Sequence, residues 1–244
     1  MDRGEKIVYW APVFFDKTVN WNMLYYDPIS LYEHTRKSMV TDAKQNDKRN
    51  NFFYCPAYKD VAKNTFLLLN PIETDLVFDN NIVRVKSTNF ISPELEHSPS
   101  MNGNRLVTYG LKYIFFTEDD IDLTLTAPFF SANNYSQEGA IVPARLKINS
   151  WFRVLNLEIN LWKDVTTLHI EKDQPIAYVN FITQDNAPVK LVRFEMNEKL
   201  HSYATGCGTS SSWESHIPLF ERYVRFKKTR MNNLVLKEIK NNLV

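Results

Sequence analysis

A histidine and a glutamate two positions apart, His169 and Glu171, form the residue pair in this chain that is best suited to chemistry. On a β-strand, side chains at positions i and i+2 lie on the same face, so both can reach one metal ion. A downstream histidine, His201 or His216, would complete the two-histidine, one-carboxylate set that holds Fe²⁺ in non-haem iron oxygenases. The pattern therefore allows an oxygenase of the 2-oxoglutarate type.

Two features of the surrounding sequence favour a simpler explanation. The apolar neighbours of the pair alternate with it, which is typical of a strand that exposes the other face to water. The downstream histidines lie in an expected loop and at an expected helix start, where the oxygenase fold would have a strand. We therefore expect no catalytic residue and no cofactor, and we keep Fe²⁺ held by His169, Glu171 and His216 as the alternative.

Cys207 lies in the chain's glycine-rich patch, which runs from Gly206 to Ser212. A nucleophilic cysteine assisted by His201 or His216 is one interpretation. The patch carries neither a recognisable nucleophile signature nor a phosphate-loop pattern, and glycine and serine residues are typical of flexible connectors. We expect a connector at this point of the chain.

A run of carboxylates follows the strand expected at 105–117, and it consists of Glu118, Asp119, Asp120 and Asp122. Carboxylates this close together are able to bind Ca²⁺, but their spacing does not fit the EF-hand loop. Acidic residues are also common in turns, where they bond to the backbone. The sequence favours turn acids over a calcium site.

Basic residues gather in the C-terminal segment, which has no glycine or proline after Pro218 and repeats apolar residues at helical spacing. We predict one helix over 217–244, packed on the preceding domain or on a partner. Its basic excess indicates a surface for an acidic partner, with Arg222, Arg225 and Lys228 as candidate contacts. The simpler interpretation is a solvated face that the helix dipole favours. In the oxygenase alternative, Arg222 or Arg225 would anchor a substrate carboxylate.

The elements that must position these residues are mainly strands. From Arg105 to Met196, apolar and polar residues alternate with a period of two and are interrupted by polar turns. In the centre of this region, Leu155, Leu157 and Ile159 share one face. We expect strands near 105–117, 120–126, 140–148, 151–162, 165–171, 175–183 and 187–196, preceded by strands at 65–69, 75–78 and 82–86.

The N-terminal part is less regular. A strand from Ile7 to Phe15 is expected at the edge or the end of a sheet, because Pro12 lacks the backbone donor that a central strand needs. Short helices are expected at 29–39 and 58–63, and loops at 41–51 and 92–104. The segment 41–51 is charged and lacks large apolar residues, which is typical of a surface loop.

The composition excludes several classes of protein. Basic and acidic residues number 29 and 28, and the net charge of +1 argues against nucleic acid or a membrane surface as a general partner. A hydrophobic fraction of 44% supplies a core, and 14% of the residues are aromatic. The aromatic clusters favour core or interface anchors, with a carbohydrate-stacking platform as the lesser alternative. Cys55 and Cys207 are expected as reduced thiols, and the N-terminus lacks the apolar region of a secretion signal.

Four segments carry a resemblance to a known family. They are Gly110 to Thr117, Leu125 to Pro128, Ser150 to Arg153 and Glu171 to Tyr178. Together they cover about the middle third of the chain, and they resemble an uncharacterised β-rich family of tailed phages and some bacteria. Asp173 stands where that family has a turn glycine. The resemblance implies a phage-encoded protein with a jelly-roll-like sandwich, and it implies no activity.

These observations lead to one fold and two functions. We predict a mainly β protein, a jelly-roll-like antiparallel β-sandwich over 1–216 with an N-terminal extension, followed by a C-terminal helix over 217–244. The expected function is that of a non-enzymatic viral structural or protein-interaction protein, such as a virion component. Its expected partners are other viral or host protein chains, including further copies of itself, and its expected location is the host cytoplasm or the virion. The alternative is the Fe²⁺ oxygenase.

Overall fold

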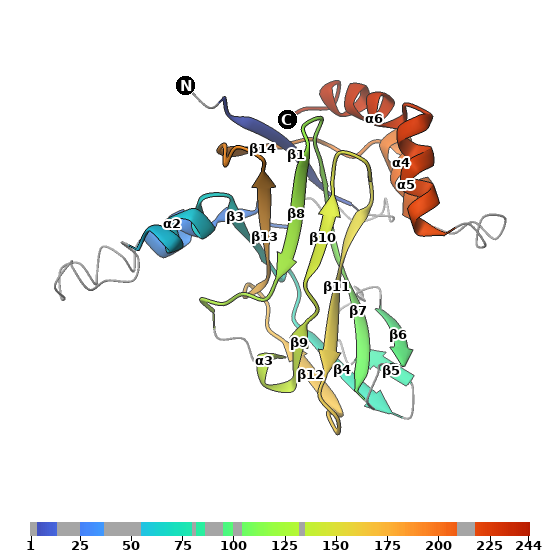
Figure 1. Ribbon diagram of the computed structural model, residues 1–244. Coiled ribbons are helices and arrows are strands. Elements are labelled where there is room, and N and C mark those ends of the chain that lie inside the picture. Colours follow the sequence, from blue (N-terminus) through green and yellow to red (C-terminus); the bar gives the residue numbers. More distant parts are fainter. Residues whose placement is uncertain are drawn as a thin grey trace.

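Two β-sheets packed face to face form the centre of the molecule, and a smaller third sheet extends it at one end (Figure 1). The computed structural model describes residues 4–13, 25–36, 55–79, 82–85, 95–99, 104–131, 135–208 and 218–244. The predicted loop at 41–51 and the residue His216 lie outside this part of the chain. The mainly β fold with a helical C-terminus is confirmed.

The first sheet has the order β14 (Val189–Arg193), β1 (Lys6–Pro12), β7 (Arg105–Phe116), β11 (Val154–Leu161) and β9 (Gly139–Ile141), and β6 (Leu95–Pro99) also pairs with β7. The second sheet has the order β10 (Ala144–Lys147), β8 (Ile121–Thr126), β13 (Pro175–Thr183), β3 (Thr65–Leu69) and β2 (Ile29–Ser30). The third sheet has the order β12 (Thr167–Ile170), β4 (Thr74–Asp79) and β5 (Ile82–Val85). All pairs are antiparallel except β1 with β14, which is parallel.

The alternating pattern of the sequence determines which side chains enter the core. In β11, Leu155, Leu157 and Ile159 are buried between the sheets, while the residues between them are half-buried on the other face. The two sheets meet through contacts such as that of Phe115 with Phe181, whose ring centroids lie 5.5 Å apart in an edge-to-face arrangement. Burying one such side chain contributes about 1.5–3 kcal/mol. This layer contains the largest cluster of buried apolar side chains in the described structure, so it contributes most to stability.

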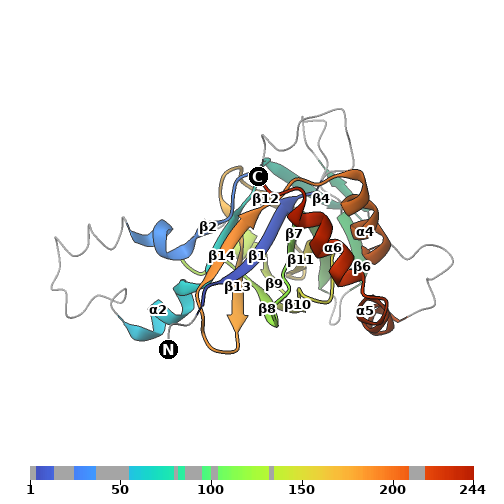
Figure 2. The ribbon, with the colours of Figure 1, turned by 90° about the horizontal axis from the view of Figure 1, so that it is seen from above.

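Helices cover both outer faces of the sandwich, as the view from above shows (Figure 2). The helices α4 (Glu198–Gly208), α5 (Leu219–Lys228) and α6 (Met231–Lys240) share a second apolar cluster with the outer face of the first sheet. On the opposite side, α2 (Pro56–Lys63) and a helical segment at 31–36 cover the second sheet near Leu67 and Tyr178. A short helix, α3 (Tyr135–Glu138), precedes β9.

The strand that contains Pro12 is not an edge strand, which corrects one of the two predicted placements. β1 lies between β14 and β7, but its pairing with β14 ends at Trp10. Pro12 therefore occupies the end of the strand, where only β7 is a neighbour and the missing backbone donor costs no hydrogen bond to β14. The predicted loop at 92–104 is also partly wrong, since β6 lies within it.

The C-terminal segment forms two helices instead of the predicted one, and a further helix precedes them. The break falls at Arg230, whose φ of 56° places it in the left-handed region, and α6 begins directly after it. The turn lets Phe226 of α5 and Val235 of α6 both enter the cluster on the first sheet, which one straight helix could not achieve. In addition, α4 occupies part of the region expected to be a connector.

Candidate functional site

The pair singled out for chemistry lies in the third sheet, where His169 faces a carboxylate of the neighbouring strand. His169 of β12 is directly opposite Asp75 of β4, and 2.5 Å separates its Nδ1 from Asp75 Oδ1. This hydrogen bond is the main reason that the pKa of His169 is raised above its usual value of 6.5. The nearby charges of Glu73 and Glu171 act in the same direction, while desolvation opposes them.

Further carboxylates surround the same imidazole. Glu138 of α3 has its pKa raised by burial, and the neighbouring His169 acts against that rise. Glu171 accepts a hydrogen bond from the Gln174 side chain. The negative charges of these acids favour the protonated, positively charged form of His169. The interaction of His169 with Glu138 joins α3 to the third sheet.

The structure does not bring the predicted metal ligands together within the part of the chain that it describes. His201 lies on α4, which both views place apart from β12 (Figures 1 and 2). Among the described residues, no three His, Cys, Asp or Glu side chains converge on a point where they would hold a metal. The set of His169, Glu171 and His216 stays a prediction, because His216 lies outside the described residues.

The four acids after β7 each interact with a protein donor. Lys240 Nζ lies 3.4 Å from Glu118 Oε2, and Lys6 Nζ lies 2.8 Å from Asp119 Oδ1. The side chains of Gln184 and Asn149 donate to Asp120, and Arg145 forms an ion pair with Asp122. This network supports the interpretation as turn acids.

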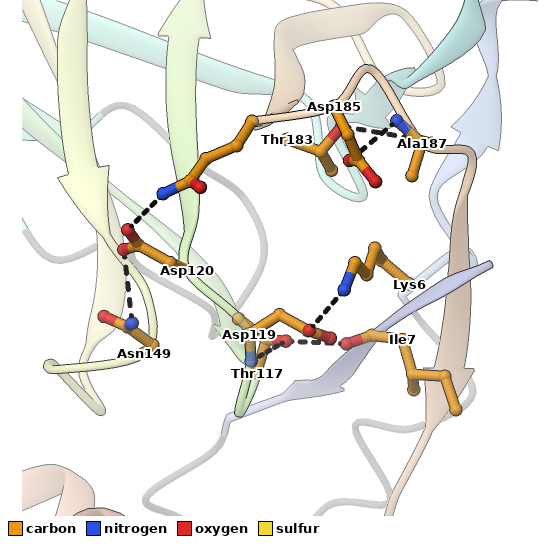
Figure 3. Close-up of polar contacts among 10 residues, drawn as sticks. Lys6, Ile7, Thr117, Asp119, Asp120, Asn149, Thr183, Asp185 and Ala187 are labelled. Atoms are coloured by element: carbon orange, nitrogen blue, oxygen red, sulfur yellow. Dashed lines mark hydrogen bonds and ion pairs between the residues drawn. The ribbon is translucent and has the colours of Figure 1, made fainter. Parts of the chain in front are cut away.

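Several of these bonds tie together three loops at one end of the sandwich (Figure 3). Thr117 Oγ1 donates to the carbonyl of Ile7 at 2.7 Å and also accepts from the backbone N–H of Asp119. A pocket of about 200 Å³ between Lys6, Asp120 and the Thr183–Asp185 turn is lined by these groups. Since the groups already bond to one another, the pocket is explained as the junction of the loops.

The predicted partner-binding residues lie on α5, which is held firmly on the sandwich. The rings of Tyr223 and Trp151 stack with their centroids 4.0 Å apart, and Phe226 meets Phe116 edge-to-face at 6.5 Å. These contacts orient the opposite face of the helix towards solvent. Arg225 and Lys228 lie on that exposed face, whereas Arg222 is half-buried.

The exposed basic surface is larger than the predicted set of residues. We define the α5–α6 surface by Arg225, Lys227, Lys228 and Arg230, all exposed within six consecutive positions that include no acidic residue. Two apolar side chains on the same helices are also exposed, Phe220 at 75% and Leu234 at 49% of their surface. The cations at 227 and 230 are visible in the sequence, but only the structure shows that all four are exposed and that they lie at the end of α5 and the turn into α6.

None of the helices in the described part of the chain combines the length and the apolar character that a membrane-spanning helix needs.

In comparisons with known proteins, no family model, no curated protein and no solved structure gives a significant match to this chain.

Proposed function

We propose that this chain is a non-enzymatic protein-interaction protein that binds an acidic protein partner through the α5–α6 surface. The observation that carries the proposal is the cluster of four exposed cations in six residues, on two helices that also expose Phe220 and Leu234. The family resemblance supports a viral origin of the protein. The specific proposal is a component of the virus particle with a jelly-roll-like fold. The partner is then another viral chain, a host chain or a further copy of this protein.

The chemistry of the surface favours a protein over a nucleic acid. Protein interfaces combine apolar anchors with a charged rim and are rich in aromatic residues and arginine. The two arginines of the α5–α6 surface and the exposed Phe220 and Leu234 of the same helices are residues of this kind, and the net charge of the whole chain is only +1. Three of the cations lie in the last turn of α5, where the helix dipole favours them even without a partner.

Photo-crosslinking tests this surface directly. A crosslinking amino acid at Lys228 is expected to capture a defined protein when the chain is expressed in the organism that encodes it. The matched control is Lys147, an exposed lysine on β10 of the second sheet. The proposal is overturned when both positions capture the same set of proteins, or when neither captures any.

Charge reversal tests the role of the cations once that protein has been identified. The variant Lys227→Glu/Lys228→Glu is expected to weaken binding at least tenfold, and to do so less at high salt, because screening weakens the attraction. The variant Lys147→Glu/Lys190→Glu changes the net charge equally and is expected to bind like the original chain. Equal losses in both variants would reduce the effect to net charge and contradict a specific surface.

A further inference from the structure

An open groove of about 360 Å³ lies between α2 and the outer face of the second sheet. Figure 2 shows that α2 lies on the opposite side of the sandwich from α5 and α6. The volume of the groove falls in the range of about 300–1,000 Å³ that is typical of small-molecule sites. The groove is lined by Asp60, Val61, Thr65, Thr124, Thr126, Phe129 and Asn180. Most of these side chains are polar but uncharged.

The polar side chains form an ordered row across three neighbouring strands. Asn180 of β13 is paired in register with Thr124 of β8 on one side and with Thr65 of β3 on the other. The Asn180 amide nitrogen donates to Thr65 Oγ1 at 2.7 Å, which fixes the orientation of the amide. Because the nitrogen is used in this way, the amide oxygen is the atom with acceptor capacity for a ligand.

An aromatic ring stands beside this row. Phe129 is 53% exposed although it is large and apolar. Its ring is held by edge-to-face contacts with the buried Tyr178 at 4.9 Å and with Phe130 at 5.0 Å, and Phe130 in turn meets Tyr58 of α2. The groove therefore presents an aromatic surface in a fixed position next to hydroxyl, amide and carboxylate groups.

We infer that this groove binds carbohydrate, specifically a neutral sugar unit of a glycan. A sugar ring has an apolar C–H face, which matches an exposed aromatic ring, and a rim of hydroxyls that both donate and accept. Asp60 and Asn180 supply acceptors, and the half-buried Thr126 supplies a hydroxyl that can donate and accept. The hydroxyls of Thr65 and Thr124 donate to backbone carbonyls of the protein itself and shape the wall of the groove. Among the described residues, those that line the groove include a carboxylate and no lysine or arginine, which disfavours phosphorylated, sulfated or acidic sugars.

The sheet topology argues against an extended peptide in the same groove. Strand addition needs a free sheet edge, because the peptide pairs with unpaired backbone groups. The strands under the groove, β8, β13 and β3, are interior strands of the second sheet and are paired on both sides. A ligand in the groove must therefore be recognised by side chains alone.

Glycan binding by the full chain tests the inference. The fluorescently labelled chain is applied to an array of neutral and acidic glycans, and the best neutral glycan is then titrated by isothermal calorimetry. Phe129→Ala and Asn180→Ala are expected to weaken that binding about tenfold each, equivalent to about 1.4 kcal/mol. Trp162→Ala, which removes an exposed aromatic residue directly after β11 of the first sheet, is the matched control and is expected to leave the affinity unchanged.

The outcomes divide clearly. Binding of a neutral glycan that is lost in Phe129→Ala and kept in Trp162→Ala, with equal melting temperatures, supports the inference. An array without any bound neutral glycan overturns it, as does preferred binding of acidic glycans or an affinity that survives both groove substitutions. Thr126→Val, which changes one hydroxyl at nearly constant volume, provides a second groove variant in case Asn180→Ala lowers the melting temperature. The α5–α6 surface is on the opposite side, so its crosslinking result is independent of this one.

Discussion

The imidazole of His169 and the carboxylate of Asp75 form a hydrogen-bonded pair across two strands, with 2.5 Å between Nδ1 and Oδ1. They occupy directly opposed positions of β12 and β4, so the pair holds the third sheet together through side chains as well as backbone. The charges of the nearby Glu73 and Glu171 also raise the pKa of His169, and burial raises the pKa of the neighbouring Glu138.

The first prediction concerns the pH dependence of this pair. The folded-state pKa of His169 is raised, so folding favours the protonated ring. Its stabilising contribution is complete below its ordinary pKa of about 6.5 and is lost as the pH rises through the folded-state value. The pKa of Glu138 is also raised, so the stability of the fold again decreases as the pH rises through the folded-state pKa of this carboxyl, in a lower pH range than for His169.

An NMR titration of the His169 ring measures the shift. The midpoint is expected above 6.5 in the original chain and closer to 6.5 in Asp75→Asn, because the main cause of the rise is removed. The spectrum of His169→Gln identifies the signal, and Asp122→Asn, on β8 of the second sheet, serves as the acidic control. An unchanged midpoint in Asp75→Asn would show that Asp75 does not control this histidine.

The second prediction concerns the attachment of α5, for which two phenylalanines on one helix form a matched pair. Phe226 is 5% exposed and Phe220 is 75% exposed. Phe226→Ala is expected to lower the free energy of unfolding by about 3–5 kcal/mol, the usual cost for a buried aromatic residue. Phe220→Ala is expected to change it by no more than about 0.5 kcal/mol. Urea unfolding followed by circular dichroism decides, and equal effects would mean that α5 is not docked through Phe226.

The third prediction concerns Asn70, a fully buried polar residue at the junction of the sheets. Its side chain accepts from the Tyr109 hydroxyl at 2.9 Å and donates to backbone carbonyls that include that of Glu171 at 3.0 Å. Asn70→Ala leaves several buried groups without partners and is expected to cost about 2–4 kcal/mol, whereas Tyr109→Phe removes one bond and is expected to cost about 1 kcal/mol. Thermal unfolding measures both, with the exposed Asn233→Ala as control. A cost for Tyr109→Phe that equals that of Asn70→Ala would contradict this network.

The fourth prediction concerns metal. Since His169 is engaged by Asp75, anaerobic reconstitution with Fe²⁺ is expected to leave far less than one iron per chain by elemental analysis. The oxygenase alternative predicts the opposite, namely stoichiometric iron that is lost in both Glu171→Ala and His216→Ala. That result would replace the binding function with the enzymatic one.

The sequence by itself determined most strands from residue 65 onwards and the buried face of strands such as β8 and β11, although it predicted neither β2 nor β6. The period of two in segments such as Leu155 to Leu161 reflects a local property, because neighbouring side chains of a strand point to opposite faces whatever lies beyond. Turn residues such as Asp173, with its positive φ of 64°, likewise act through their own backbone. The strands at 65–69, 105–117 and 175–183 were therefore predictable within about a residue.

Only the tertiary structure decided which distant residues meet. Nothing local to His169 specifies Asp75 as its partner, since the two are 94 positions apart and are brought together by strand pairing. The interior position of β1, the break at Arg230 and the row of Thr124, Asn180 and Thr65 also depend on how elements pack. The alternation of apolar and polar residues predicts which face of a strand or helix is buried. Which other element packs against that face depends on the packing of the whole chain.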